Sequence, residues 1–346
     1  MTEGISVFNT MRLQSEALES VDVWCLDELK KAWYRSLEQW GRPPLILGGA
    51  SNVILPKSYS GMIVWVRCGG VRRVFEDCES MVLEVGAGHG WHDLVSWSVD
   101  QGLCGIENLA LIPGTVGAAC VQNIGAYGVS LSDVFLSCDV WQSTTGDCVK
   151  FSKNDCCFGY RDSVFKQNRL SIGVIWMVRL VLKKRSDLNI RYPRLRQYFL
   201  GSDESKLTLK HVYDAVVLIR SLRLPDVKKM GTVGSFFINP CLSQEAFDGM
   251  INHEGLEYIL MSDGRVKLFA GNLLALCGWR GYNESGVRAC YQNPIVLINK
   301  NGGVVVADQV LCLAKRMILS VWRQFGIKLL IEPMVLNQMG DLVDLR

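Results

Sequence analysis

The sequence predicts a fold of the α+β or mixed α/β class. Short apolar stretches of strand length end at glycine-rich turns, and they alternate with segments whose apolar residues have helical spacing. The chain has 346 residues, enough for two or three domains at about 150 residues each. Hydrophobic residues make up 49% and charged residues 21%, which excludes a disordered chain.

The N-terminal half contains two predicted helices and several short strands. The first helix opens at Asp27 and stops at Gly41, and its apolar face consists of Leu29, Trp33, Leu37 and Trp40. A second helix spans 91–101. The expected strands are 45–47, 62–66, 81–85, 134–141 and 172–182.

The C-terminal half begins with a change of pattern near Thr208. This residue can cap a helix whose inner face carries Val212, Val216 and Ile219, and a further helix spans 308–325 with Gly326 as its stop. Strands are expected at 295–298 and 328–331. We expect a domain boundary at 205–225. Because the last strand lacks local partners, the chain beyond 326 is expected to return to the earlier domain.

Charge and cysteine content limit the functional classes. A net charge of +3 shows no strong attraction to nucleic acid or to an anionic membrane. The longest apolar run, 170–178, is shorter than the roughly 20 residues of a membrane helix, and the N-terminus lacks a secretory signal. The 13 cysteines suggest reduced, mostly buried thiols in a cytoplasmic protein. No metal site is expected, because no cysteine or carboxylate pattern accompanies His89 and His92.

Four glycine-rich turns in the first 130 residues each follow an apolar strand, at 48–52, 86–90, 113–117 and 125–128. Glycine allows backbone N–H groups to approach a phosphate without an intervening side chain. The turns match neither the Rossmann G-x-G-x-x-G pattern nor the P-loop. One such turn is usually only a turn, but four of them predict one long anionic cofactor held by several loops.

Several longer strings occur in order along the chain: Asn9-Thr10, LILGGASNV at 45–53, GAGHGWHDLV at 86–95, ENLALIPGTVGAACVQNIGAYG at 107–128, FGYRDSVFK at 158–166, LRLPD at 222–226, GSFFINP at 234–240 and IEP at 331–333. On these strings the chain resembles the UDP-N-acetylenolpyruvoylglucosamine reductase (MurB) family, FAD enzymes of bacterial cell wall synthesis. Tyr192, in the basic stretch 191–196, resembles the tyrosine loop of the longer subclass of this family.

The resemblance implies a fold of the vanillyl-alcohol-oxidase type. Two FAD-binding subdomains would span 1–67 and 68–207, and a separate α/β substrate-binding domain would span 208–326. The C-terminal strand, in 327–346, would rejoin the FAD-binding part. The resemblance further implies noncovalent FAD, NADPH as co-substrate, UDP-N-acetylglucosamine enolpyruvate as substrate, and a cytoplasmic monomer that binds neither nucleic acid nor membrane.

The family's reaction identifies three catalytic candidates. NADPH reduces FAD, a hydride reaches the terminal vinyl carbon of the enolpyruvyl ether, and a proton completes a lactyl ether. The resemblance implies that Arg161 binds the carboxylate and enolate, that Ser235 donates the proton, and that Glu332 orients the enolate or relays the proton. By themselves these residues have ordinary alternatives, namely a bond from Arg161 to Asp162 or a loop carbonyl, a serine that caps a turn, and a surface carboxylate.

The resemblance also implies contacts with the two ligands. The expected FAD contacts are Gly48, Gly49, Ala50, Ser51, Asn52, Gly114, Thr115, Gly117, Asn123, Gly125, Ala126 and Tyr127. The expected substrate contacts are Tyr160, Tyr192, Arg220, Arg223 and Asn239. Each of these arginines also has a simpler explanation as a solvated side chain.

The sequence departs from the family pattern at five positions: Ala50, Ile238, Asn272, Cys290 and Met334. Ala50 replaces a frequent glycine, which is acceptable unless the backbone there needs positive φ. The others affect peripheral substrate and nicotinamide contacts rather than the three catalytic candidates.

Two other functional classes remain open at this point. The first is another FAD oxidoreductase of the same fold, acting on an alcohol or a lactone, in which the flavin is often tethered to histidine or cysteine. The second is a non-catalytic nucleotide-binding module, which we would expect to lack Arg161, Ser235 or Glu332. The chain has all three.

Overall fold

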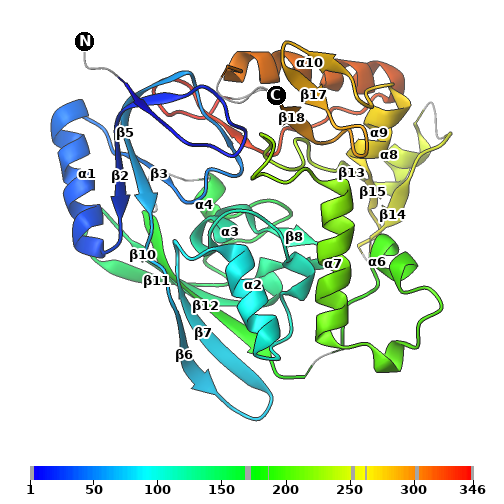
Figure 1. Ribbon diagram of the computed structural model, residues 1–346, viewed down its shortest axis with the longest axis horizontal. Helices are drawn as coiled ribbons and strands as arrows, with labels where there is room; N and C mark the ends of the chain where they lie inside the picture. The colour runs from blue at the N-terminus through cyan, green and yellow to red at the C-terminus, as the bar shows by residue number, and fades with distance from the viewer. Residues whose placement is uncertain are drawn as a thin grey trace. The chain divides into compact units, whose positions relative to one another are not determined.

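The structure is a computed structural model that describes residues 4–167, 173–185, 187–250, 254–261, 263–300 and 304–343. Contacts within the chain divide it into two units. Unit 1 consists of Met1–Leu18, Ala50–Ser60 and Ser221–Arg346, and unit 2 consists of Glu19–Gly49 and Gly61–Arg220. Helices and strands occur in both units (Figure 1), so the α+β class is confirmed. The division into four segments expected from the sequence stays a prediction.

Unit 2 is built around an antiparallel five-stranded sheet with the order β11-β10-β12-β7-β6. Its strands are β6 (Val71–Glu76), β7 (Ser80–Gly86), β10 (Phe135–Trp141), β11 (Cys148–Ser152) and β12 (Val174–Lys183). Alternate residues of β7 and β12, such as Leu83 and Leu180, are buried in the core. Between them, Arg179 forms ion pairs with Glu84 on β7 (2.6 Å) and Asp139 on β10 (2.8 Å). These pairs connect three neighbouring strands and help to define their register.

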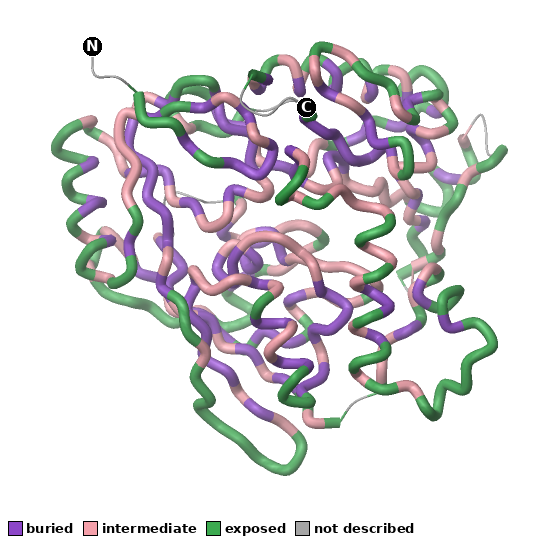
Figure 2. Tube along the Cα trace, in the orientation of Figure 1, coloured by how far each residue is buried: buried purple, intermediate pink, exposed green. Residues whose placement is uncertain are grey.

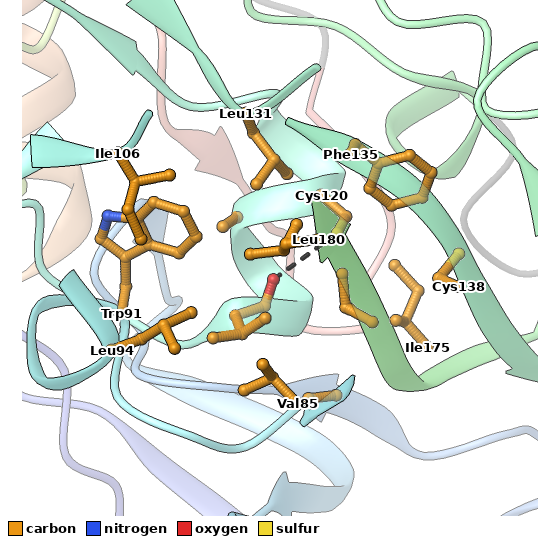
Figure 3. Packing of buried hydrophobic residues seen from close by; sticks show 14 of the residues in the cluster. Val85, Trp91, Leu94, Ile106, Cys120, Leu131, Phe135, Cys138, Ile175 and Leu180 are labelled. Carbon is orange, nitrogen blue, oxygen red and sulfur yellow. Dashed lines mark hydrogen bonds between the residues drawn. The ribbon is translucent and has the colours of Figure 1, made fainter. Parts of the chain in front are cut away.

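The helices of unit 2 are α1 (Leu26–Trp40), α2 (Trp91–Asp100), α3 (Val116–Gln122), α4 (Val164–Gln167), α6 (Pro193–Tyr198) and α7 (Leu209–Arg223), whose last three residues are counted with unit 1. Short 3₁₀ helices occupy Glu107–Leu109, Leu131–Asp133 and Glu204–Lys206. In Figure 3, Cys120 of α3 lies between Trp91 of α2 and the sheet residues Cys138 and Ile175. The short helix α3 is therefore buried in the core of unit 2, where it packs on β7 and β12.

The remaining strands of unit 2 are short. Strand β3 (Leu45–Leu47) pairs in parallel with β5 (Ser58–Val66), and β8 (Gly125–Ala126) forms a hairpin with β9 (Val129–Ser130). Strands β5 and β2 (Glu16–Val23) each begin in unit 1 and end in unit 2.

Unit 1 has its own core and three small sheets. Helix α10 (Ala307–Phe325) buries one stripe of side chains in this core, including Val310, Leu313 and Met317. Figure 2 shows the buried parts of the chain in purple. The antiparallel sheets are β13 (Cys241–Leu242), β15 (Val266–Leu268) and β14 (Tyr258–Leu260), and β16 (Asn283–Glu284), β17 (Val287–Ala289) and β18 (Leu297–Asn299). A parallel pair joins β4 (Val53–Ile54) to β19 (Met334–Val335). The other elements are β1 (Ile5–Ser6), α8 (Gln244–Asp248) and α9 (Ala270–Leu276).

Most elements expected from the sequence are confirmed, with corrections at some boundaries. Helix α1 begins after Cys25 rather than at Asp27, and Gly41 ends it in the left-handed conformation with φ 66°. Leu37 of this helix is exposed, because the buried stripe follows Leu29 and Trp33 instead. The start of the strand expected at 172–182 lies outside the described residues, and its observed part is β12.

Other expectations were wrong. No strand forms at 328–331, where Ile331 makes only an isolated bridge to Phe237, and the strand expected at 295–298 begins at Leu297. The cysteines are not mostly buried: six of the 13 are buried and five are exposed. Within the described ranges, no helix combines the length and the apolar character that a membrane crossing requires.

Candidate functional site

Two of the glycine-rich turns are joined by backbone hydrogen bonds in unit 2. The amide of Trp91 donates to Gly114 O (3.0 Å), that of Val116 to His89 O (2.9 Å), and that of Gly117 to Ala87 O (2.8 Å). The turns at 86–90 and 113–117, which are separate in sequence, therefore form one structure at the start of α3.

The beginning of the turn at 48–52 lies against the same structure. A Cβ atom on Gly48 would lie 2.2 Å from Thr115 Oγ1, and one on Gly49 would lie 2.9 Å from Gly114 Cα. Only glycine permits this approach of two main chains. The packing of the two turns therefore requires these two glycines, and their contact with FAD stays a prediction.

Packing against another chain segment also explains two glycines of the 86–90 turn. A Cβ on Gly86 would lie 2.5 Å from Cys68 O, and one on Gly88 would lie 2.6 Å from Val66 O. Both positions therefore require glycine, because another chain segment, around Val66 and Cys68, passes too close for a side chain. The sequence could not distinguish this packing requirement from an approach to a cofactor.

The turn at 48–52 continues into unit 1 at Ala50, which has φ 45°. Both the amide and the Oγ1 of Thr10 are 3.3 Å from the Ala50 carbonyl oxygen, to which they donate. Asn52 O accepts a hydrogen bond from the amide of Met334 (3.0 Å), next to the parallel pair of β4 and β19. The alanine that departs from the family pattern thus occupies the left-handed conformation that glycine adopts without strain.

The β8–β9 hairpin carries Tyr127 in an unusual backbone conformation. Tyr127 (φ 48°) and Gly128 (φ 81°) form its two-residue turn, which is typical of asparagine–glycine rather than tyrosine–glycine. The side-chain amide of Asn108 donates to Tyr127 O (2.9 Å) and to Asn189 O (2.8 Å). The rings of Tyr127 and Tyr192 meet edge to face, with centroids 5.4 Å apart. Asn108, which sequence reasoning did not single out, therefore connects this hairpin to the segment that carries Tyr192.

Arg161 lies on a tight turn of unit 2 and has φ 57°. Its Nη2 donates to Gly125 O (2.5 Å), which is one of the ordinary alternatives considered for this residue. Lys166 Nζ donates to the Arg161 carbonyl (3.0 Å), and Asn123 Nδ2 donates to Gly159 O (2.8 Å). The guanidinium lies 5.3 Å from the ring centroid of Tyr160, which is 42% exposed. Bonds from neighbouring elements therefore hold both the strained backbone and the side chain of Arg161.

Arg220, near the end of α7, supplies a second guanidinium to unit 2. Its Nη2 donates to Leu111 O (3.4 Å), whereas its Nε is buried and has no hydrogen-bond partner among the described residues. Burial is the main factor that lowers the pKa of Arg220, and the positive charge of Arg161 lowers this pKa further. Two guanidiniums that disfavour each other attract a carboxylate or phosphate strongly.

Ser235 and Glu332 lie in unit 1, on two adjacent segments. Gly234 precedes the serine with φ 77°, and Ser235 forms an isolated bridge with Val296. The amide of Glu332 donates to Phe236 O (3.0 Å), so the two candidate residues lie within one residue of each other in register. Both are half-buried. Phe236 and Phe237, which follow Ser235, are buried.

Two further predicted residues have structural contacts of their own. Asn239 Oδ1 accepts a hydrogen bond from the amide of Ala270 (2.9 Å) and so caps the start of α9. His92 Nδ1 accepts from the amide of Leu111 (3.1 Å), and its ring stacks on Tyr213. Arg223 is the last residue of α7. The catalytic and ligand-binding roles of all the site residues stay predictions.

The fold and the glycine-rich turns define the class of protein. Residues 26–152 match the family model described as an FAD binding domain. The structure is similar to that of UDP-N-acetylenolpyruvylglucosamine reductase from Thermus caldophilus, with a TM-score of 0.64 and 22% sequence identity, covering 94% of this chain and 95% of the other. This likeness confirms the expected fold. The protein is an FAD-dependent oxidoreductase.

The particular family follows from the C-terminal part and from the relatives. Residues 226–336 match the model described as the C-terminal domain of UDP-N-acetylenolpyruvoylglucosamine reductase. Proteins of that name from Bordetella pertussis and Pseudomonas syringae are 39% and 37% identical, covering 96% and 95% of this chain and 94% and 96% of their own lengths. The chain therefore belongs to the UDP-N-acetylenolpyruvoylglucosamine reductase family, as the resemblance predicts. These findings do not favour an oxidase of alcohols or lactones.

Proposed function

We propose that the protein catalyses the NADPH-dependent reduction of UDP-N-acetylglucosamine enolpyruvate to UDP-N-acetylmuramate, with noncovalently bound FAD, in the synthesis of peptidoglycan precursors. The observation that carries this proposal is the 39% identity with a reductase of this name over 96% of the chain. The presence of Arg161, Ser235 and Glu332 supports it further.

FAD, when bound, supplies the hydride that reaches the terminal vinyl carbon of the substrate. We propose that the glycine-rich turns hold it through their backbone N–H groups. The contributing residues would be Gly48, Gly49, Ala50, Ser51, Asn52, Gly114, Thr115, Gly117, Asn123, Gly125, Ala126 and Tyr127. The match of residues 26–152 to an FAD binding domain, and the hydrogen bonds that join the turns at 86–90 and 113–117, support this assignment.

Arg161 would bind the substrate carboxylate and stabilise the negative charge that spreads into it. A guanidinium stays charged at any working pH and can donate two parallel hydrogen bonds to a carboxylate. The bond from Arg161 to Gly125 O restricts the directions in which its other N–H groups can point. Such preorganisation is what stabilises developing charge without reorganisation during the reaction.

Ser235 would deliver the proton that completes the lactyl ether, and Glu332 would orient the enolate or relay that proton. Because free serine is a very weak acid, its surroundings must assist the transfer. The two neighbouring phenylalanines are 0% and 1% exposed, so they exclude water on that side of Ser235. The hydrogen bond from the Glu332 amide to Phe236 O, which joins the two segments, supports this pairing of roles.

The remaining assignments belong to the same proposal. Tyr160, Tyr192, Arg220, Arg223 and Asn239 would contact the uridine and pyrophosphate of the substrate. The protein would act as a cytoplasmic monomer, and the four segments 1–67, 68–207, 208–326 and 327–346 would be its domains. The unpartnered Nε of Arg220 supports an anion site in unit 2.

The purified protein allows a direct test. Its visible spectrum should show a flavin, and acid precipitation should release that flavin into the supernatant. NADPH oxidation should accelerate strongly when UDP-N-acetylglucosamine enolpyruvate is added. A flavin that stays with the precipitate, or NADPH oxidation that is indifferent to the sugar nucleotide, would contradict the proposal.

A further inference from the structure

A short loop near the N-terminus, residues 9–13, has no role in the proposed chemistry and yet is almost completely buried. Asn9 closes the loop, because its Nδ2 donates to Leu13 O (3.1 Å) and its Oδ1 accepts from the amide of Leu13 (2.9 Å). Asn9 is 1% exposed and Met11 is 0% exposed. Burying the polar groups of a loop costs free energy unless they form hydrogen bonds. The hydrogen-bond partners of this loop therefore show which segments it is built to hold.

Thr10 contacts two segments that the proposed function assigns to different tasks. Its amide and its Oγ1 donate to the carbonyl of Ala50, in the turn proposed to hold FAD. Its own carbonyl accepts a hydrogen bond from the amide of Thr232 (2.8 Å), three residues before Ser235. Thr10 thus links the proposed flavin turn directly to the segment that carries the proposed proton donor.

Asn299, at the end of β18, fixes the same arrangement from the other side. Its Nδ2 donates to Met11 O (3.1 Å) and Arg12 O (2.9 Å). Its backbone exchanges two hydrogen bonds with Gly231, at 2.8 and 3.0 Å. A Cβ atom on Gly231 would lie 2.3 Å from Met11 O. Asn299 therefore holds the loop and the beginning of the Ser235 segment against each other.

Arg12 provides a third connection between the loop and the Ser235 segment. Its Nη2 donates to Lys228 O (2.6 Å) and its Nη1 to Lys229 O (3.1 Å). The carbonyls just before Gly231 are thus held as well. The side chain of Asn299 and the loop's own side chains of Asn9, Thr10 and Arg12 hold a loop that contains no proposed catalytic residue.

We propose that residues 9–13 together with Asn299 form a positioning element that sets Ser235 relative to the flavin turn at Ala50. The inference rests on the proposed function and deepens it. Proton delivery to carbon requires the donor within hydrogen-bonding reach of its target, and a displacement of about 1 Å can cost about 100-fold in rate. Asn299 is the principal positioning residue, because its side chain donates hydrogen bonds to two carbonyls of the loop and its backbone forms hydrogen bonds with Gly231.

The test is Asn299→Leu, which has a similar volume but no donors. In stopped-flow experiments, flavin reduction by NADPH should stay within about twofold of the wild-type rate. Reoxidation by the enolpyruvyl substrate should slow by about 10- to 100-fold. The solvent deuterium isotope effect on reoxidation should rise, because proton transfer becomes more rate-limiting. Independently of activity, amide hydrogen exchange of the flavin-free protein should become faster at Gly231 and Thr232.

Two further variants separate positioning from packing and stability. Asn299→Asp keeps the shape but presents oxygen to the carbonyls of Met11 and Arg12, so reoxidation should slow at least as much as in the leucine variant. Ser320→Ala removes the acceptor of Trp279 Nε1 (2.6 Å) in unit 1 and serves as the stability control. It should lower the melting temperature but leave both half-reactions at wild-type rates.

If Asn299→Leu does not fold, Thr10→Val tests the same element, because it removes only the hydroxyl bond to Ala50. Its reoxidation should slow by about two- to tenfold, with flavin reduction unchanged. Equal slowing of both half-reactions, or of neither, would overturn the positioning role. A wild-type protein whose reduced flavin is not reoxidised by the enolpyruvyl substrate would instead overturn the proposed function, so the two failures are distinguishable.

Discussion

The turn of Arg161 in unit 2 and the segment of Ser235 in unit 1 are supported in different ways. Arg161 is held by Gly125, 36 residues away, and by Lys166, five residues away. The segment of Ser235 depends on Thr10, more than 200 positions away in the sequence, and Asn299 joins that same loop across 288 positions. The turn of Arg161 is supported by residues within 36 positions in the sequence. The segment of Ser235 is supported by residues much farther away along the chain.

This difference predicts which substitutions will affect the chemistry at each region. The supports of Arg161 lie in the strings at 107–128 and 158–166, so a substitution near Arg161 disturbs a region that is already recognisable as functional. Distant supports exist only after the chain has closed long loops. We therefore expect the chemistry at Ser235 to respond to substitutions that no motif would mark as functional.

Ser235→Ala should have the largest effect. It tests the region of Ser235 separately from that of Arg161. Flavin reduction by NADPH needs no proton donor at the substrate carbon, so it should proceed at a near-normal rate. Reoxidation by the enolpyruvyl substrate should slow by about 100- to 10,000-fold, and Ser235→Cys should recover part of it. Stopped-flow absorbance measures both steps. Ser243→Ala, which removes the side-chain cap of α8, is the control substitution of a serine. Equal slowing of both steps in Ser235→Ala would exclude the role of Ser235 as the acid.

A second substitution tests whether the glycine turns of unit 2 are needed for the cofactor. Gly114 has φ 113°, a conformation closed to β-branched residues, and its main chain touches Gly49. Gly114→Val should weaken FAD binding at least tenfold, measured by the flavin retained after gel filtration. Gly146→Val carries comparable backbone strain, with φ 78° in the open turn before β11. It should lose stability but keep its flavin; full retention in Gly114→Val would contradict the placement of FAD.

Asn108→Leu sharpens the comparison, because Asn108 gives unit 2 a support between residues that are distant in sequence. It joins Tyr127 to Asn189, which lies 81 residues beyond it. Losing both bonds should free the Tyr192 segment and raise the KM for the sugar nucleotide about tenfold, which corresponds to ~1.4 kcal/mol. Asn189→Ala removes the bond from Nδ2 to Gly128 O (3.0 Å) and the bond from the Arg191 amide to Oδ1 (3.3 Å), but it keeps both Asn108 bonds and should give a smaller rise. An unchanged KM in both variants would show that this network is purely structural.

The smallest expected effect concerns the backbone strain at the junction of the two units. Ala50→Gly should relieve the positive φ of 45°, and the relief should exceed the entropic cost of an added glycine by roughly 0.5–1 kcal/mol. The melting temperature should rise by about 1–3 °C in calorimetry. Ala110→Gly, at φ −57°, should lower it. A decrease in Ala50→Gly would show that the left-handed conformation carries no strain.

Local patterns predicted the parts of this protein that depend on neighbouring residues. The spacing of Leu29 and Trp33 placed α1, and the glycine after Trp40 placed its end, because helix periodicity and capping act within a few residues. The failed strand at 328–331 shows the limit of this reasoning. An apolar stretch is compatible with a strand, but only a partner along its whole length makes one, and here a single bridge to Phe237 forms.

The candidate site divides along the same line. The strings around Arg161, Ser235 and Glu332 are contiguous in sequence, so the family could be inferred from them. The role of Asn299 could not, because nothing near it in sequence indicates that its side chain meets Met11 O and Arg12 O. The packing requirement at the glycines 86 and 88 could not be predicted either, since it comes from Cys68 and Val66 in another segment.

The sequence by itself determined the α+β class, the glycine-rich turns, most helices and strands, and the family with its proposed chemistry. Each of these depends on composition, on short-range periodicity or on contiguous strings. Only the tertiary structure decided that unit 1 is assembled from three separate stretches of chain, and that Thr10 and Asn299 fix the segment of Ser235. These features depend on contacts between residues hundreds of positions apart, and such contacts leave no periodic trace in the sequence.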